Sequence, residues 1–93
     1  MKNAEIAAVF QDIARLLELK KENIFKIRAY RKVAQSIEPL PVEVEKLCRE
    51  GRLREIPGAG EAIVKKITEM ITTGRLEFYE KLKAEFPQEV IKK

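Results

Sequence analysis

The chain of 93 residues contains no histidine and a single cysteine, Cys48. The absence of histidine excludes histidine-based catalytic triads, imidazole general bases and most zinc sites. One cysteine cannot form a disulfide within the chain, and this favours a reducing cytoplasm. Any acid–base or nucleophilic chemistry would therefore have to use lysine, glutamate, aspartate, tyrosine or Cys48.

Long apolar segments are absent as well. A membrane-spanning helix needs about 18 or more consecutive apolar residues, and no run in this sequence comes near that length. The first residues also lack the apolar core of a secretory signal peptide. A chain of this length has enough apolar residues for one small core and no room for a second. We therefore expect a single domain, without a membrane partner, in the cytoplasm.

The charged residues lean toward the basic side, with 19 Lys and Arg against 15 Asp and Glu. The resulting net charge of +4 mildly favours anionic partners. The excess is concentrated in residues 20–32, KKENIFKIRAYRK, which hold six basic side chains and one acidic side chain. A run of this kind is also typical of a solvated helix face, so charge alone does not identify a partner.

Apolar residues recur with the helical period along the chain, and no β-type alternation occurs. We predict an all-α fold, a compact bundle of about five short helices. Asn3 is the predicted N-cap of the first helix, and Asn23 that of the second, which stops at Pro39. The other helices are predicted at residues 42–50, 60–73 and 76–86, ending at Gly51, Gly74 and Pro87. Residues 1–86 are the predicted domain, and residues 87–93 a linker to the rest of a longer protein.

The loop PGAG, residues 57–60, forms a very short connection between two helices. Gly58 and Gly60 permit positive φ and a close approach of the backbone. We expect the N–H groups of this loop, at the positive end of the next helix, to form an anion site that needs no charged side chain. A DNA phosphate fits such a site and would be held without regard to base identity. The alternative is a helix–helix turn that happens to use glycine.

Two lysines follow the loop, and helical geometry of about 100° per residue separates them. Lys65 is predicted opposite the apolar stripe and fully solvated. Lys66 is predicted at the edge of the stripe, one turn after the small Ala62. A half-buried amine there could serve Schiff-base chemistry, which requires the neutral form. The alternative is a lysine whose stem covers the edge of the core while its ammonium group stays in water.

The basic run contains a second pair of candidate site residues. Lys26 falls on the same side of its predicted helix as Tyr30 and Val33, rather than on the polar face. The lysine could project into a groove to which Tyr30, one turn later, offers a hydroxyl. The alternative is a tyrosine at the edge of the core with a neighbouring lysine stem.

The order hydrophobic–Pro–Gly–x–Gly, followed by Ile63, Lys65, Lys66 and Ile67, resembles the helix-hairpin-helix motif of sequence-independent DNA-binding proteins. Together with the earlier run NIFKIRAYRKVAQSI, the stretch LREIPGAGEAIVKKITEMITTGRLEFYEKL resembles the N-terminal small domain of family X (beta-type) DNA polymerases, bacterial and archaeal members above all. The resemblance extends over nearly the whole chain, from about residue 3 to residue 86. It implies a monomeric, nucleoid-associated DNA repair protein whose polymerase domains would be covalently linked in the parent chain.

The resemblance also implies where DNA binds. The partner would be gapped, nicked or single-stranded DNA, held by its backbone and its 5′-phosphate. The implied DNA-binding residues are Gly58, Ala59, Gly60, Lys65 and Lys66 at the hairpin, with Lys26, Tyr30 and Arg31 at the phosphate pocket. A monovalent cation, Na⁺ or K⁺, is implied at the backbone carbonyls of Arg54, Ile56 and Ala59.

In beta-type relatives this domain is also a 5′-deoxyribose-phosphate lyase, and the position of its nucleophile corresponds to Lys66. The amine forms an imine at C1′ of the abasic sugar, and β-elimination releases the sugar phosphate. Phe25, Ala62 and Phe78 replace a histidine and two basic residues of the relatives, so the pocket has fewer donors. Lyase activity is therefore an alternative to binding alone, and a helical protein-interaction module is a second alternative. The chain contains no polymerase active site.

Overall fold

The computed structural model describes residues 1–86, and the predicted linker at residues 87–93 lies outside this described part. The elements are α1 (Asn3–Leu19), α2 (Ile24–Ile37), α3 (Val44–Arg49), the 3₁₀ helix η1 (Leu53–Glu55), α4 (Glu61–Thr73) and α5 (Glu77–Ala84). The predicted all-α fold with five α-helices is confirmed, and residues 1–86 contain no strand. None of these helices is both long and apolar enough to cross a membrane.

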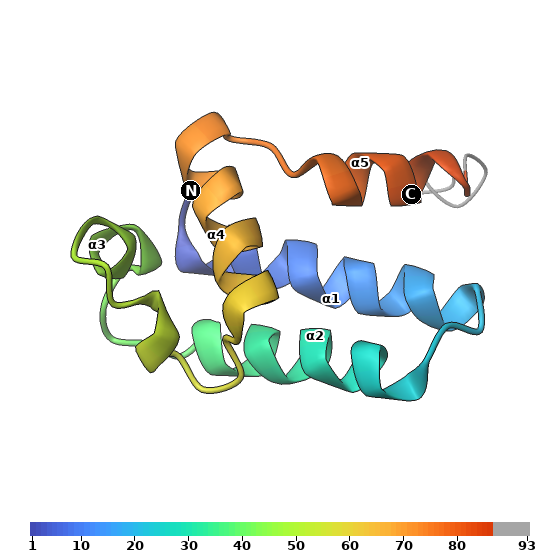
Figure 1. Ribbon diagram of the computed structural model, residues 1–93, viewed down its shortest axis with the longest axis horizontal. Coiled ribbons are helices and arrows are strands. Elements are labelled where there is room, and N and C mark those ends of the chain that lie inside the picture. The colour runs from blue at the N-terminus through green and yellow to red at the C-terminus, as the bar shows by residue number, and fades with distance from the viewer. Residues whose placement is uncertain (87–93) are drawn as a thin grey trace.

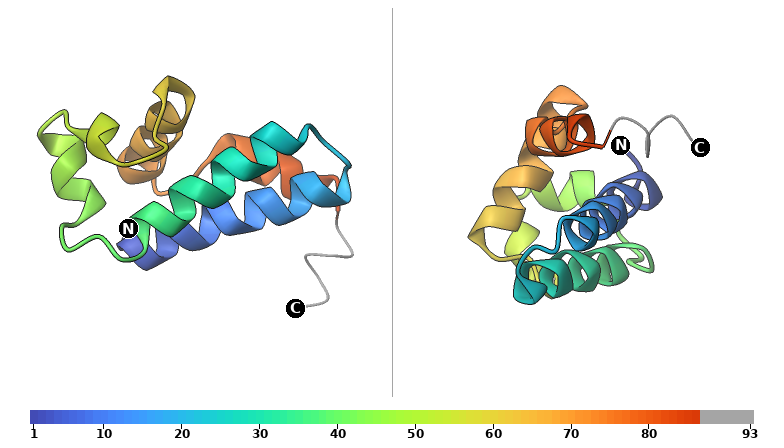
Figure 2. Two further views of the ribbon diagram at one scale, coloured as in Figure 1. Left: turned by 90° about the horizontal axis from the view of Figure 1, so that it is seen from below. Right: turned by 90° about the vertical axis from the view of Figure 1, so that its right-hand side faces the viewer.

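The helices α1 and α2 form an antiparallel pair, α4 lies across this pair, and α5 runs beside α1 in the same direction (Figures 1 and 2). The core lies where α1, α2 and α4 meet, and its fully buried side chains include Phe10, Ile13, Val33, Ile37 and Ile67. These residues recur every three or four positions, which places them on one face of each helix. Their burial fixes the orientation of α4 on the α1–α2 pair.

Polar contacts hold α5 against α1. The Tyr79 hydroxyl donates to Asp12 Oδ2 at 2.5 Å, and Lys20 Nζ pairs with Glu85 at 2.9 Å. Burial and the Asp12 carboxylate both raise the pKa of Tyr79, so this phenol remains a hydrogen-bond donor at neutral pH. The contacts place one face of α5 beside the C-terminal half of α1.

Several predicted helix ends are confirmed. The Asn23 side chain accepts a hydrogen bond from Phe25 N–H at 2.7 Å and caps α2. Gly51 and Gly74 have φ of +69° and +76°, the left-handed conformation expected just beyond a helix. The predicted third and fifth helices were too long, since α3 begins at Val44 and α5 ends at Ala84.

The prediction that Asn3 caps the first helix is wrong. The N-cap of α1 is Lys2, whose N–H donates to the Glu5 carboxylate at 2.7 Å. The Asn3 side chain instead reaches the start of α3, where Oδ1 accepts from Val44 N–H at 2.8 Å and Nδ2 donates to Val42 O at 2.9 Å. An asparagine amide can do both because it carries a donor and an acceptor. Asn3 therefore links the start of α1 to the start of α3.

We expect Asn3→Ala to lower the free energy of unfolding by about 1–2 kcal/mol, because it leaves both backbone groups at the start of α3 without a partner. Urea unfolding followed by circular dichroism measures this loss. Gln11→Ala, a change at an exposed position of α1, is the matched control and should change stability by less than about 0.5 kcal/mol. Equal effects of the two substitutions would contradict the assigned role of Asn3.

Candidate nucleic-acid interface

The predicted hairpin is formed by η1, the loop at residues 56–60 and α4. Leu53 before the loop, Ile56 and Ala59 within it, and Ile63 and Ile67 after it are all buried. These apolar side chains anchor both arms of the hairpin in the core. The glycines of the loop are thereby held at the surface, where both are exposed.

The two loop glycines have different roles. Gly58 has φ of +90°, and a Cβ atom added to it would lie 3.4 Å from Lys32 Cγ and 3.6 Å from Val33 N. Gly60 has φ of −77°, and its added Cβ would meet no atom within 4 Å. The positive φ that both glycines permit therefore occurs at Gly58 and not at Gly60. Gly58 packs the loop on α2, whereas Gly60 leaves open space in front of α4.

Of the N–H groups predicted to be free in the loop, only that of Gly58 has no acceptor among the described residues, and the other free groups lie in the first turn of α4. Within the loop, Ala59 N–H donates to Ile56 O at 3.0 Å and Gly60 N–H to Gly58 O at 3.2 Å. No side chain caps α4, and the first bond of the helix runs from Val64 N–H to Gly60 O. In the described part of the chain, the N–H groups of residues 61–63 therefore have no acceptor. They are three donors at the positive end of a helix, suited to an anion.

The two lysines of α4 are placed as the helical geometry predicted. Lys65 is exposed, and Lys66 is half-buried at the edge of the apolar stripe. The Lys66 ammonium lies 4.9 Å from the centre of the Phe78 ring. A cation over an aromatic face is attracted by the ring's electrons, so Phe78 of α5 positions Lys66.

A groove of about 450 Å³ lies between the C-terminal end of α1, α2, α4 and α5, and we call it the α2–α4–α5 groove. It brings together three predicted site residues, Lys26, Tyr30 and Lys66. Ala62 and Phe78, the departures from the family pattern, line it too. The groove also contains two lysines that the sequence reasoning missed, Lys20 and Lys81, and two carboxylates, Glu22 and Glu85.

Aromatic rings extend from the core into this groove. Tyr30 stacks on Phe10 with 5.9 Å between ring centres and on Phe78 with 6.1 Å. Tyr30 is 8% exposed, and burial raises the pKa of its hydroxyl. This hydroxyl has no hydrogen-bond partner in residues 1–86. Every fully buried side-chain nitrogen or oxygen in these residues does have a partner, so the Tyr30 oxygen is not fully buried. The Tyr30 hydroxyl must therefore open into the groove as a donor available to a ligand.

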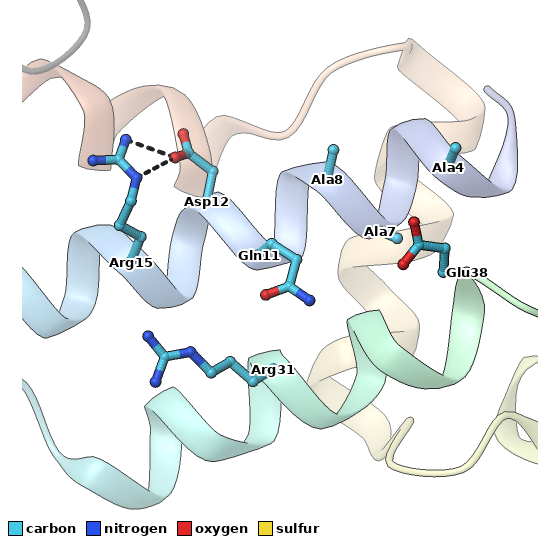
Figure 3. Close-up of a pocket in the computed structure, with 8 residues that line it drawn as sticks. All are labelled: Ala4, Ala7, Ala8, Gln11, Asp12, Arg15, Arg31 and Glu38. Atoms are coloured by element: carbon cyan, nitrogen blue, oxygen red, sulfur yellow. Dashed lines mark hydrogen bonds and ion pairs between the residues drawn. The ribbon is translucent and has the colours of Figure 1, made fainter.

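Arg31 does not join the other predicted site residues. It lies on the other side of α2, in a groove of about 540 Å³ between α1 and α2 (Figure 3). Its guanidinium group pairs with Glu18 at 2.6 Å. Across this groove Asp12 pairs with Arg15 at 2.7 Å, so the charges along it are largely matched.

A family model of the helix-hairpin-helix domain matches residues 1–76. The chain therefore belongs to this family. The match includes the hairpin and all of α4 but ends before α5, which supplies Phe78 and Lys81 to the groove. Helix-hairpin-helix domains bind DNA, and DNA is the partner that the family indicates.

Replacing Gly60 by serine tests the role of the uncapped amides. The extended backbone of Gly60 suits an N-cap, and a serine oxygen there would accept from the second or third amide of α4. We expect Gly60→Ser to stabilise the domain by a few tenths of a kcal/mol, about 0.3, yet to weaken DNA binding about tenfold, since it occupies donors meant for a phosphate. Thermal unfolding and fluorescence anisotropy with labelled DNA measure the two effects.

Gly60→Ala is the matched control, because it adds the same Cβ without the oxygen. It should bind DNA more tightly than Gly60→Ser and be less stable. If both substitutions leave DNA affinity unchanged, the α4 amides do not contact DNA.

Proposed function

We propose that the domain binds the backbone of gapped or nicked DNA and holds its 5′-phosphate, as the N-terminal domain of a family X repair polymerase. The observation that carries this proposal is the unpartnered Tyr30 hydroxyl in a groove with four lysines and two glutamates. A phosphate oxygen is an acceptor for that hydroxyl, and nearby lysines compensate its charge.

The hairpin and the groove would act together. The three free amides of α4 and the exposed Lys65 suit a phosphate within a continuous strand. The groove suits a terminal phosphate. The DNA strand continues from only one side of such a group, so the group can enter between α2 and α5. Backbone contacts of this kind carry no base specificity. In the parent protein the linked domains would carry polymerase chemistry, and the domain would bind as a monomer.

A monovalent cation at the hairpin is part of the proposal. Its ligands would be the carbonyl oxygens of Arg54, Ile56 and Ala59. Ile56 O already accepts Ala59 N–H at 3.0 Å, but a carbonyl oxygen has a second lone pair for a cation. When bound, Na⁺ or K⁺ would bring positive charge between these carbonyls and a DNA phosphate.

The preference for a terminal phosphate is tested with two gapped DNAs that differ only in a 5′-phosphate or a 5′-hydroxyl. We expect tighter binding of the phosphorylated DNA. Tyr30→Phe should reduce this affinity about tenfold, the effect of one hydrogen bond to a charged group, and leave the hydroxyl DNA unaffected. Affinity should also fall with salt, with a log–log slope of about −3 for about three neutralised phosphates.

Equal affinity for the DNA with a 5′-phosphate and the DNA with a 5′-hydroxyl would exclude the groove as a phosphate site. Absence of DNA binding at low salt would instead favour the protein-interaction alternative. Tyr30→Phe should not destabilise the domain, because the hydroxyl has no partner to lose, and thermal unfolding checks this point.

Lyase activity is the second candidate function, and the half-buried position of Lys66 in the same groove favours it. The Lys66 nitrogen would form a C=N bond with C1′ of the open abasic sugar as water leaves. Loss of a C2′ proton would then break the C3′–O bond, so that the DNA leaves with a 5′-phosphate. Water would hydrolyse the remaining C=N bond, which frees the Lys66 amine and the unsaturated sugar phosphate. The ammonium would first have to lose a proton and leave its position over Phe78.

Borohydride reduction traps the imine, so we expect a covalent adduct with DNA bearing a 5′-deoxyribose phosphate. Lys66→Arg keeps the positive charge but cannot form this imine, and the adduct should disappear while gapped DNA remains bound. An adduct that persists would assign the nucleophile to another lysine. No adduct with the wild-type domain, alongside retained binding, would leave phosphate binding as the function of the groove.

A further inference from the structure

An ion pair between α1 and α5 lies in the α2–α4–α5 groove. Lys20 Nζ contacts Glu85 Oε1 at 2.9 Å, and both residues line the groove. Lys20 is the C-cap of α1 and Glu85 the C-cap of α5, and the two helices run side by side in the same direction (Figure 1). The C-terminal ends of these helices are thereby joined by a contact between opposite charges.

Glu85 stands at an unfavourable position for a carboxylate. The C-terminal end of a helix carries partial negative charge, which favours lysine and disfavours glutamate. Lys20 follows this rule at the end of α1, whereas Glu85 breaks it at the end of α5. Residues that break a local rule of stability are expected at functional sites. The function of Glu85 is therefore sought in its partner, Lys20.

The position of Glu85 on α5 directs its side chain to the groove. Phe78, Lys81 and Glu85 are separated by three, four and seven residues, which places them on one face of the helix. Phe78 holds the Lys66 ammonium 4.9 Å from the centre of its ring, and Glu85 holds Lys20. Helix α5 therefore positions two of the four lysines of the groove, and it lies beyond the residues that the family model matches.

The ion pair can be broken at small cost. The Lys20 and Glu85 side chains are 33% and 49% exposed, so water solvates either charge when the two separate. Exposed ion pairs contribute little to stability. The Tyr79 hydroxyl donates to Asp12 at 2.5 Å and still holds α5 on α1 when the pair is broken. Lys20 can therefore change partners while the helices stay in place.

A terminal phosphate is a stronger partner for Lys20 than a carboxylate. It carries a charge of about −1.5 to −2 at pH 7 and has three acceptor oxygens, whereas the Glu85 carboxylate has one charge and two oxygens. The hydrogen bond to Glu85 and the charges of Glu85 and Glu22 raise the pKa of Lys20, so its ammonium stays charged at neutral pH. On the proposed function, the phosphate enters this groove at the Tyr30 hydroxyl.

We propose that Glu85 holds Lys20 in the free domain, and that a terminal phosphate displaces this carboxylate and takes Lys20 as a ligand. This inference rests on the proposed function, since it concerns the phosphate site of the same groove. Lys20 is then a further phosphate-binding residue, and Glu85 is a positioning residue that competes with the DNA for it. The competition lowers the affinity for the 5′ end, so the domain releases this end more readily.

The test compares gapped DNA that carries a 5′-phosphate with the same DNA that carries a 5′-hydroxyl, by fluorescence anisotropy. The ratio of the two affinities cancels the contacts that both DNAs make elsewhere. Glu85→Gln removes the competitor and should raise this ratio about three- to fivefold, the equivalent of an exposed ion pair. Lys20→Met removes the ligand and should lower the ratio about tenfold. Lys20→Arg keeps the positive charge and should retain most of the ratio.

Glu80→Gln is the matched control for the change in charge. Glu80 lies on the same helix and pairs with Arg75 at 2.7 Å, outside the groove. This substitution should change the two affinities equally and leave their ratio as it is. Circular dichroism should show all variants folded, because Lys20 and Glu85 are both exposed.

The double variant distinguishes competition for Lys20 from simple repulsion of the DNA. If Glu85 competes for Lys20, Glu85→Gln should raise the ratio less than about twofold in the Lys20→Met background, since the two residues are coupled. If Glu85 only repels the phosphate, its substitution raises the ratio equally with and without Lys20. That result would overturn the inference.

The outcomes separate this inference from the proposed function. An unchanged ratio in Glu85→Gln or in Lys20→Met would overturn the exchange of partners. A wild-type preference for the phosphorylated DNA would, in that case, still support the groove as a phosphate site. If the wild-type domain shows no such preference, the proposed phosphate site fails and this inference fails with it.

Discussion

The hairpin backbone rests directly on α2 at Gly58, and the remaining surface is arranged around this contact. A Cβ there would only come into ordinary contact with Lys32 and the backbone of Val33, but the φ of +90° is strained for any residue with a Cβ. Glycine adopts this φ without strain. The contact fixes where the N-terminus of α4 lies relative to α2, and so sets the distance between the free amides and the α2–α4–α5 groove.

The groove differs in chemistry from the donor-rich pocket that the family resemblance implies. Ala62 contributes no charge, and Phe78 contributes a ring that stacks on Tyr30 and positions the Lys66 ammonium. Lys20 lies in the groove, but its pairing with Glu85 reduces the charge it offers. Much of the electrostatic attraction must therefore come from other parts of the surface. The hairpin amides supply part of it, together with Lys26, Arg28 and Lys32 of α2, which pair with no carboxylate among residues 1–86.

The helices could be predicted because their signals lie within or next to each helix in the sequence. These signals are the apolar period and the residues at the helix ends, such as Asn23, Gly51 and Gly74. The partly buried position of Lys66 followed from the same period. The role of Asn3 could not be predicted, because its partners lie about forty residues away at the start of α3. Lys81 carried no local signal, since only the packing of α5 brings it to the groove. Arg31 follows Tyr30 directly, and a step of one residue on a helix turns the side chain by about 100°, away from the groove.

Helix α4 links the two proposed phosphate sites. Its free amides lie at its first turn, and Lys66 follows Gly60 by six residues, about 9 Å along the axis. Both sites are therefore within reach of one DNA molecule. An uninterrupted duplex offers the hairpin a backbone phosphate but has no terminal phosphate for the groove. A gap or nick offers both. On the proposed function, the shape of the interface selects interrupted DNA without any contact that distinguishes one base from another.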